Sequence, residues 1–151
     1  MDKYTIQKRI LELLPLWHYQ VNKPIKQLLN DDMTLEIYYS ILLLEWLNRD
    51  VTLSEFGKLT MMKKQQVTKV VNKLEEKSLV ERYVDTQNRR TVWLKLTDGA
   101  HSYVEQYVNN VSCFDDLTTQ ISDEDKVKLE ASLQTIIDIF VKLPQYKEII
   151  K

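Results

Sequence analysis

The segment from Leu53 to Thr97 constrains the fold of this 151-residue chain more than any other. A short helical pattern over 53–59 is followed, after a turn, by a second one over about 63–77. On a helical wheel, one side of the second segment carries only the apolar residues Val67, Val70, Val71 and Leu74. This spacing predicts an amphipathic helix with that stripe against a core.

The opposite side of this helix carries long hydrogen-bonding side chains. Gln and Asn pair with adenine edges, and Lys binds guanine or phosphate, so the face suits a DNA major groove. A solvated helix face has a similar composition, and the wheel alone leaves both interpretations open. The outer face consists of Gln65, Lys69, Asn72 and Glu76, flanked by Gln66, Thr68 and Lys73.

The start of the same helix favours an anionic partner. No Ser, Thr, Asp or Asn stands just before Lys63, although these residues are the preferred N-caps. Lys63 and Lys64 also place positive charge at the positive end of the helix dipole. A phosphate docked there would relieve the charge and bind the unpaired N–H groups. Two exposed, salt-screened lysines are the alternative interpretation.

Two runs rich in β-branched and aromatic residues follow, Leu79–Val84 and Thr91–Leu96, and predict a hairpin. Its polar tip ends in Arg89 and Arg90. Arginine beside a groove-docked helix can enter the adjacent minor groove. The order helix, turn, helix, hairpin predicts a winged helix-turn-helix within a mainly α protein. The segment Arg49–Thr52 can add a third strand to this wing.

Charge is distributed unevenly along the chain. The net charge is −1, yet residues 58–95 contain ten Lys or Arg and four Asp or Glu, a net charge of +6. The rest of the chain has a net charge of −7. Phosphates meet a local surface, so this basic segment is the relevant feature for a polyanionic partner.

The segment KLEEKSLVERYVDTQNRRTVWLKLTDGA resembles the wing signature of the MarR (multiple antibiotic resistance regulator) family. The resemblance implies a dimeric DNA-binding regulator, usually a repressor, that responds to a ligand or an oxidant. It also implies that Arg90 is the wing-tip arginine. The matching positions are Leu74, Glu75, Lys77, Leu79, Val80, Arg82, Asp85, Arg90, Leu94, Leu96, Thr97 and Gly99.

Two positions depart from the family pattern. Ser78 stands where the pattern has Gly after the recognition helix, so we expect this helix to close without a residue of positive φ. Asn88 stands where the pattern has an Asp that holds the wing-tip arginine. The direction of the Arg90 side chain therefore follows less directly from the sequence than it does in chains that have this Asp.

Helices are predicted on both sides of the winged segment 34–97. The first spans 5–30, with Pro15 and Pro24 expected to kink or divide it. A helix from Leu35 to Leu47, capped by Thr34, should bury Leu35, Tyr38, Tyr39, Leu42, Leu43 and Trp46. Residues 98–145 should form a long helix through Val108, Val111 and Phe114, a break at Asp115–Ile121, and a last helix capped by Ser122.

The terminal helices are more apolar than a single winged domain requires as cover, so we expect 5–30 and 98–145 to form a homodimer. A self-contained helical core is the alternative. A two-fold dimer predicts a pseudo-palindromic operator with half-sites about 34 to 36 Å apart. The whole chain, 1–151, is expected to be one domain. No apolar run reaches the roughly 18 residues of a membrane span, so we expect a cytoplasmic protein without a membrane partner.

A small aromatic or anionic effector is implied by the family resemblance, and aromatic residues between the helices are its candidate contacts. Aromatic residues at helical spacing are more often core, which is the competing interpretation. The candidates are Trp17, His18, Tyr38, Tyr39 and Trp46. The single cysteine, Cys113, has Asp115 and Asp116 nearby, which raise a thiol pKa and favour a structural over a redox role.

The predicted function is a sequence-specific double-stranded DNA-binding regulator, a dimeric repressor released by a small molecule or an oxidant. A winged-helix protein–protein interaction module without DNA binding is the alternative. With two His, one Cys, no Gly-rich phosphate loop and no HxxxH or CxxC spacing, we expect no enzyme activity, no cofactor and no metal. The predicted DNA contacts are Lys63, Lys64, Gln65, Gln66, Thr68, Lys69, Asn72, Lys73, Arg89 and Arg90.

Overall fold

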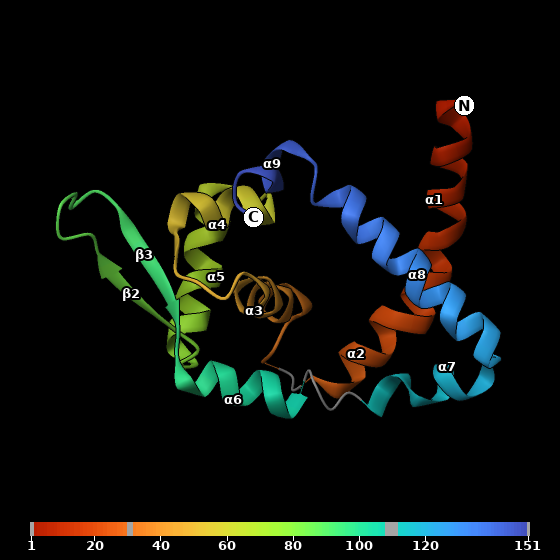
Figure 1. Cartoon of the computed structure of the whole chain (residues 1–151). Coiled ribbons are helices and arrows are strands. Elements are labelled where there is room, and N and C mark those ends of the chain that lie inside the picture. The colour runs from red at the N-terminus through yellow and green to blue at the C-terminus, as the bar shows by residue number, and fades with distance from the viewer. Residues whose placement is uncertain (1, 30–31, 108–111, 151) are drawn as a thin grey trace.

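The computed structural model describes residues 2–29, 32–107 and 112–150. Its α-helices are α1 (Lys3–Trp17), α2 (Lys23–Leu28), α3 (Leu35–Leu47), α4 (Leu53–Thr60), α5 (Lys64–Glu76), α6 (Asp98–Tyr107), α7 (Asp115–Gln120), α8 (Asp123–Phe140) and α9 (Pro144–Lys147). The strands are β1 (Val51–Thr52), β2 (Val80–Val84) and β3 (Val92–Leu96). Figure 1 shows the strands with α3, α4 and α5 at one end of the molecule and α1, α2, α7 and α8 at the other. The predicted mainly α fold with a small wing is confirmed.

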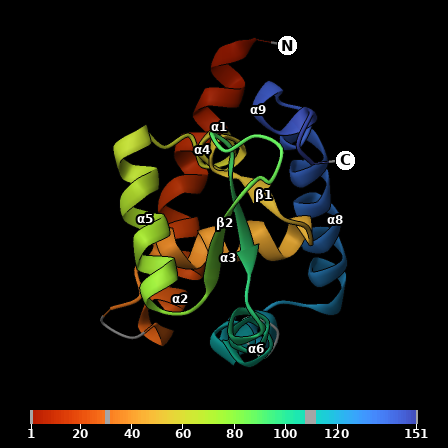
Figure 2. The same ribbon diagram turned by 90° about the vertical axis from the view of Figure 1, so that its left-hand side faces the viewer.

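The sheet is antiparallel, in the order β1-β3-β2. Strand β3 pairs with β2 from Val80↔Leu96 to Val84↔Val92, and with β1 at Val51↔Leu94. The third strand expected from Arg49–Thr52 is therefore present. Seen from the wing side, α5 and α8 lie on opposite sides of the molecule (Figure 2).

The core of the winged unit forms where the apolar stripe of α5 meets α3, α4 and the sheet. Val67, Val70, Val71 and Leu74 are all buried, as their spacing predicts. The largest side chain with no exposed surface is that of Phe56 on α4. Burial on one side of α5 leaves its opposite side exposed to solvent.

The predicted first helix is divided between its two prolines. Pro15 lies within α1, Pro24 lies in the first turn of α2, and the intervening residues His18–Asn22 form a π-helical turn. In a straight α-helix the ring of a proline clashes with the carbonyl four residues earlier. A widened turn just before Pro24 relieves that clash, since π-turns redirect the backbone carbonyls.

Helix α3 begins as predicted but buries a different face. The hydroxyl of Thr34 accepts a hydrogen bond from the backbone N–H of Ile37 at 3.2 Å. Tyr39 and Trp46, which were expected inside, are 38% and 52% exposed. The sequence LEIYYSILLLEWL is apolar on all sides, so spacing selects no single face. The buried residues are Ile37, Tyr38, Ser40, Ile41 and Leu44.

The C-terminal end of α5 corrects the expectation for Ser78. This residue has a φ of 58°, in the left-handed region. The N–H of Leu79 donates to the carbonyl of Leu74 at 2.9 Å, and the N–H of Ser78 donates to that of Glu75 at 2.9 Å. This pair of bonds is the Schellman closure that glycine usually makes. Buried Leu74 and Leu79 supply its apolar contact, which holds Ser78 in the strained conformation.

Changing Ser78→Gly is expected to raise the free energy of unfolding by about 1 kcal/mol, because glycine adopts positive φ without strain. Ser102→Gly, at an exposed position of α6, is the matched control and should lower it by a similar amount, since that position is helical. Urea unfolding of both variants measures the difference. A loss of stability at both positions would contradict the assignment of strain to Ser78.

The region after the wing differs from the expected long helix and break. Helix α6 is described as far as Tyr107, and Val108 and Val111 lie outside the described residues. Ser112–Phe114 form a 3-10 turn, and the expected break at Asp115–Ile121 contains α7 instead. Asp115 and Asp116 stand in the first turn of α7, where acidic side chains stabilise a helix.

The last long helix, α8, starts at its predicted cap, because the Ser122 hydroxyl accepts from the backbone N–H of Asp125 at 3.1 Å. A short helix, α9, follows it and was not predicted. Neither α1 nor α8 has a buried residue. In the described part of the chain, no helix has the length and hydrophobicity needed to cross a membrane.

Candidate nucleic-acid interface

Helix α5 starts without a capping side chain, as the sequence predicted. Lys63 is the N-cap residue, in an extended conformation, and makes no side-chain capping hydrogen bond. Lys64 is the first helical residue, and both lysines are exposed. The helix therefore presents unpaired N–H groups and two ammonium groups at its positive end, a combination that favours an anion.

The basic side chains of residues 58–95 fall into two groups. Three are neutralised within the chain: Lys73 pairs with Glu76 at 3.5 Å, Lys77 with Asp32 at 2.6 Å and Arg82 with Glu75 at 3.3 Å. The other seven form no ion pair with any residue that the structure describes. These seven are Lys58, Lys63, Lys64, Lys69, Arg89, Arg90 and Lys95.

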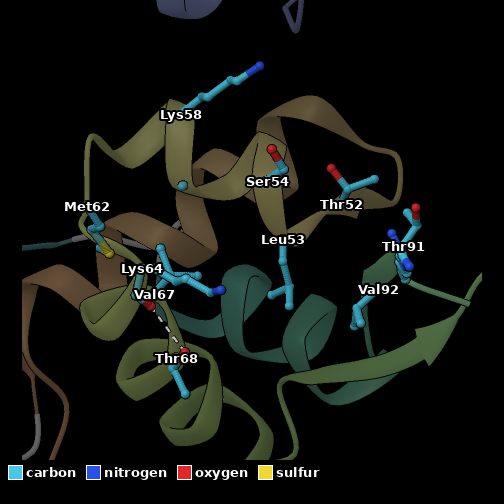
Figure 3. Close-up of a pocket in the computed structure, with 12 residues that line it drawn as sticks. Thr52, Leu53, Ser54, Lys58, Met62, Lys64, Val67, Thr68, Thr91 and Val92 are labelled. Carbon is cyan, nitrogen blue, oxygen red and sulfur yellow. Dashed lines mark hydrogen bonds between the residues drawn. The ribbon is translucent and has the colours of Figure 1, made fainter.

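Part of the unpaired group lines one cavity of about 750 Å³ between α4, α5 and the wing. Figure 3 shows Lys64 and Thr68 on the α5 side of this cavity and Thr91 and Val92 on the wing side. Arg90 also lines this cavity. Lys64 on α5 and Arg90 on the wing, which were predicted from separate sequence patterns, therefore lie at the same cavity. The full lining is Thr52, Leu53, Ser54, Gly57, Lys58, Met62, Lys64, Val67, Thr68, Arg90, Thr91 and Val92.

Helix α4 contributes residues that the sequence prediction omitted. Ser54 and Lys58 line the cavity and are exposed. A capping box starts α4: the Thr52 hydroxyl accepts from the N–H of Glu55 at 3.0 Å, and Glu55 Oε1 accepts from the N–H of Thr52 at 3.3 Å. The spacing Thr-x-x-Glu is visible in the sequence and could have located this helix start.

Two of the predicted amide contacts are partly engaged within the chain. Gln66 Nε2 donates to both carboxylate oxygens of Glu36 at 2.9 Å. Arg82 donates to the side-chain oxygen of Asn72. That bond uses the amide oxygen of Asn72, and its NH₂ group donates no hydrogen bond to any residue that the structure describes. Gln65 and Lys69 lie on the same exposed face, with no side-chain hydrogen bond to a described residue.

The wing tip is organised by Asp85. Its Oδ1 accepts from the N–H groups of Gln87 at 2.9 Å and Asn88 at 3.3 Å, and its Oδ2 accepts from Trp93 Nε1 at 3.0 Å. The backbone bond from Gln87 and then the Trp93 bond hold the pKa of Asp85 below its ordinary value. Asn88 Oδ1 accepts from the backbone N–H of Arg90 at 3.2 Å. Asn88 therefore fixes the main chain of Arg90 and leaves its guanidinium exposed.

The tip-side end of the wing strands is tied to Asp50, the residue before β1. The rings of Tyr83 and Trp93 stack with centroids 6.4 Å apart, and the Tyr83 hydroxyl donates to Asp50 Oδ2 at 2.5 Å. This hydrogen bond is the main cause that raises the pKa of Tyr83. The wing is thus held at the tip-side end of its strands as well as at its tip.

The five candidate effector residues are distributed over separate places. Trp46 lines a cavity of about 480 Å³ with Arg49 and Glu55, whereas Tyr39 lines another, of about 430 Å³, beside Glu36 and Gln66. Trp17, His18 and Tyr38 line none of these three cavities of the described chain. Tyr38 is buried in the core. An effector contact by these residues remains a prediction.

Cys113 is half-buried, and this burial is the main cause that raises the pKa of its thiol. Asp115 acts in the same direction, as the sequence suggested. A raised pKa lowers the thiolate fraction and so the reactivity towards oxidants. Among the described residues, no group of three or more His, Cys, Asp or Glu is arranged to hold a metal ion.

The two helices α4 and α5 are joined by a tight turn and followed by the β2–β3 hairpin, which pairs with β1; this arrangement defines a winged helix-turn-helix protein. Residues 39–92 match the family model of the MarR family, which confirms the resemblance recognised in the sequence. A search of curated proteins finds no match.

Solved structures of MarR-type regulators share this fold. A MepR mutant from a multidrug-resistant S. aureus clinical isolate aligns with a TM-score of 0.68 and 22% identity, covering 93% of this chain and 99% of that one. A MarR mutant from E. coli complexed with operator DNA has a TM-score of 0.61 and 24% identity, covering 90% and 99%. PcaV from Streptomyces coelicolor, in complex with its natural ligand, has a TM-score of 0.60 and 15% identity, covering 91% and 96%.

Proposed function

We propose that this chain is a sequence-specific double-stranded DNA-binding transcriptional regulator that acts as a homodimer. The match to the MarR family supports the broad assignment to DNA-binding transcription regulators. The observation that carries the proposal is the set of cations left unpaired within the described chain. Lys64 and Arg90 belong to this set and line one cavity from two different elements.

In this proposal α5 enters the major groove. Gln65, Lys69 and Asn72 lie on its exposed face, where they can meet base edges and phosphates. The N–H groups and lysines at the start of α5 bind a backbone phosphate. Arg89 and Arg90 at the wing tip reach the neighbouring minor groove. Ser54 and Lys58 on α4 add contacts to the phosphate backbone.

The dimer is supported by the terminal helices. Ile6, Ile10, Leu14 and Trp17 on α1 are between 38% and 56% exposed in the single chain. On α8 the exposed apolar side chains include Ile136, Ile137 and Phe140. Exposed apolar surface of this extent usually marks an interface. A two-fold axis through these helices would present two reading helices to half-sites about 34 to 36 Å apart.

The regulation we propose is repression released by a small aromatic or anionic molecule, or by an oxidant. A related fold has been solved with a natural ligand, the PcaV structure, and this supports a ligand-responsive site here. Selection of bound sequences from a random DNA pool, repeated with phenolic compounds and with peroxide, tests both parts. It yields the operator, its symmetry and the releasing signal in one experiment.

Lys69→Ala and Arg90→Ala are each expected to weaken binding to the selected operator by about 1 to 3 kcal/mol, because each removes a base or phosphate contact. Arg9→Ala is the matched control, since Arg9 is an exposed arginine on α1 that pairs with Glu12. Titrations at several salt concentrations should show a smaller salt slope for a variant that loses a phosphate contact. Unchanged affinity in both interface variants would remove these assignments.

The competing function is a protein-binding winged helix. A gel shift of the wild-type protein with a random-sequence DNA duplex at low salt distinguishes it from the DNA-binding function. Any polycationic DNA-binding surface retards such a duplex under these conditions. Absence of a shift would favour the protein-interaction module and would leave the unpaired lysines as a solvated surface.

A further inference from the structure

The chain after α8 turns back and lies against the winged unit. Figure 1 shows α9 beside α4, between the wing at one end of the molecule and α1 at the other. Ile149 is only 8% exposed, although it lies near the end of the chain. Gln145 Nε2 donates to the sulfur of Met61 at 3.5 Å, at the end of α4. We call residues 144–150 the C-terminal strap.

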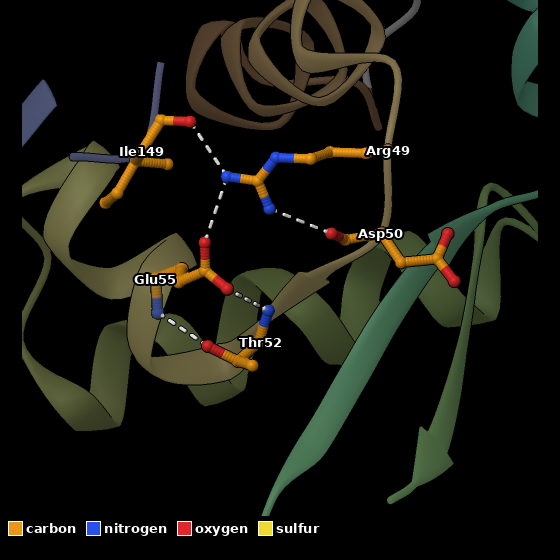
Figure 4. Close-up of polar contacts among 5 residues, drawn as sticks. All are labelled: Arg49, Asp50, Thr52, Glu55 and Ile149. Carbon is orange, nitrogen blue, oxygen red and sulfur yellow. Dashed lines mark hydrogen bonds and ion pairs between the residues drawn. The ribbon is translucent and has the colours of Figure 1, made fainter. Parts of the chain in front are cut away.

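Arg49 connects this strap to the winged unit (Figure 4). Its Nη2 donates to the backbone carbonyl of Ile149 at 2.8 Å and to Glu55 Oε2 at 3.1 Å. Its Nη1 donates to the carbonyl of Asp50 at 3.1 Å. One guanidinium therefore binds the strap, α4 and the link before β1 at the same time. A planar group with fixed donors holds these acceptors in one relative geometry.

The residues that Arg49 binds also contact residues of the proposed DNA surface and of the wing. Glu55 completes the capping box with Thr52, and Thr52 lines the cavity that holds Lys64 and Arg90. Asp50 accepts a hydrogen bond from the hydroxyl of Tyr83, which anchors β2 one residue before its tip-side end. The strap is thus joined by short polar contacts to the start of α4 and to the wing.

We propose that the C-terminal strap positions α4 and the wing for DNA binding through Arg49, and that it transmits the placement of α8 to the DNA surface. This inference rests on the proposed function. Helix α8 ends at Phe140 and the strap starts at Pro144, so only a short segment separates the proposed dimer helix from Arg49. Arg49 is a positioning residue in this scheme, because it acts through Glu55 and Asp50 and makes no phosphate contact itself.

The test uses four full-length variants: Arg49→Gln, Ile149→Ala, the double variant and Lys147→Gln as a control on an exposed strap residue. The first readout is affinity for duplex DNA of the selected operator across salt concentrations. The second is hydrogen exchange at the amides of 51–60, with melting temperature recorded for each variant.

Each single variant is expected to bind DNA about three- to tenfold more weakly, the range in which residues linking two sites act. The double variant should be no weaker than the weaker single one, since both changes break the same connection. The salt slope should stay at the wild-type value, because no phosphate contact is lost. Exchange at 51–60 should become faster in all three, and Lys147→Gln should behave as wild type. If Ile149→Ala unfolds, Ile149→Val takes its place with the same expectations.

Wild-type affinity and wild-type exchange in the single variants would overturn the proposal. Strictly additive losses in the double variant would also overturn it, since the strap and Arg49 would then act independently. A reduced salt slope in Arg49→Gln would instead make Arg49 a direct phosphate contact. If the wild-type protein binds no DNA, the proposed function fails, and the exchange at 51–60 alone decides whether the strap positions α4.

Discussion

Ile10→Glu together with Leu14→Glu is expected to convert the protein to a monomer and to weaken operator binding about a hundredfold or more. The two side chains are 51% and 56% exposed in the single chain, one helical turn apart on α1. In the proposed dimer they are buried against the partner, where an unpaired carboxylate is strongly disfavoured. A monomer binds a single half-site and loses the gain in affinity that two linked reading helices provide.

The measurement is sedimentation or light scattering for the oligomeric state, with operator titration on the same samples. Lys8→Glu is the matched control, because it places a carboxylate at an exposed position on the opposite side of the same helix. The melting of the winged unit should change little, since α1 has no residue buried within its own chain. A double variant that remains dimeric would assign the exposed face of α1 to another role.

Phe56→Ala is expected to lower the free energy of unfolding by about 3 to 5 kcal/mol. Phe56 has no exposed surface and belongs to the cluster formed by α3, α4, α5 and the sheet. The substitution leaves a cavity that the surrounding side chains fill only in part. Because typical domains are stable by about 5 to 15 kcal/mol, this loss approaches the whole stability of the winged unit.

Chemical unfolding followed by far-UV circular dichroism measures this loss, with Val84→Ala as the control at a wing position that is 51% exposed. The control should change stability by less than about 0.5 kcal/mol, as surface substitutions usually do. An equal, small effect at both positions would show that Phe56 does not lie in the cooperative core.

Sequence periodicity predicted α5 well and α3 poorly, for one physical reason. In α5 the apolar residues occupy a single stripe, so the buried face follows from the spacing alone. In α3 nearly every position is apolar, and packing against α5 and α6 selects Ile37 and Ile41 over Leu42 and Leu43. Such a choice depends on neighbours distant in sequence, which a helical wheel does not contain.

In the candidate interface, too, features set by local geometry could be predicted and features set by tertiary contacts could not. Exposure of Lys64, Lys69 and Arg90 could be predicted, because it follows from local helix and turn geometry. The engagement of Gln66 by Glu36 joins residues 30 positions apart, and the Arg49 contact with Ile149 joins residues 100 positions apart. These pairings require the tertiary fold. The positive φ of Ser78 was missed because the side chain suggested otherwise, while the buried pair Leu74 and Leu79 determined the geometry.

The π-helical turn at His18–Asn22 separates α1 from α2, so the direction of α1 is set independently of that of α2. Ile25 on α2 is buried in its own chain, whereas α1 has no buried residue. One residue corresponds to a rotation of about 100° around a helix axis. Adding or removing a single residue in this turn would therefore rotate the exposed apolar face of α1 around the helix axis. The distance between the two reading helices of the proposed dimer would change, while the winged unit would keep its own core.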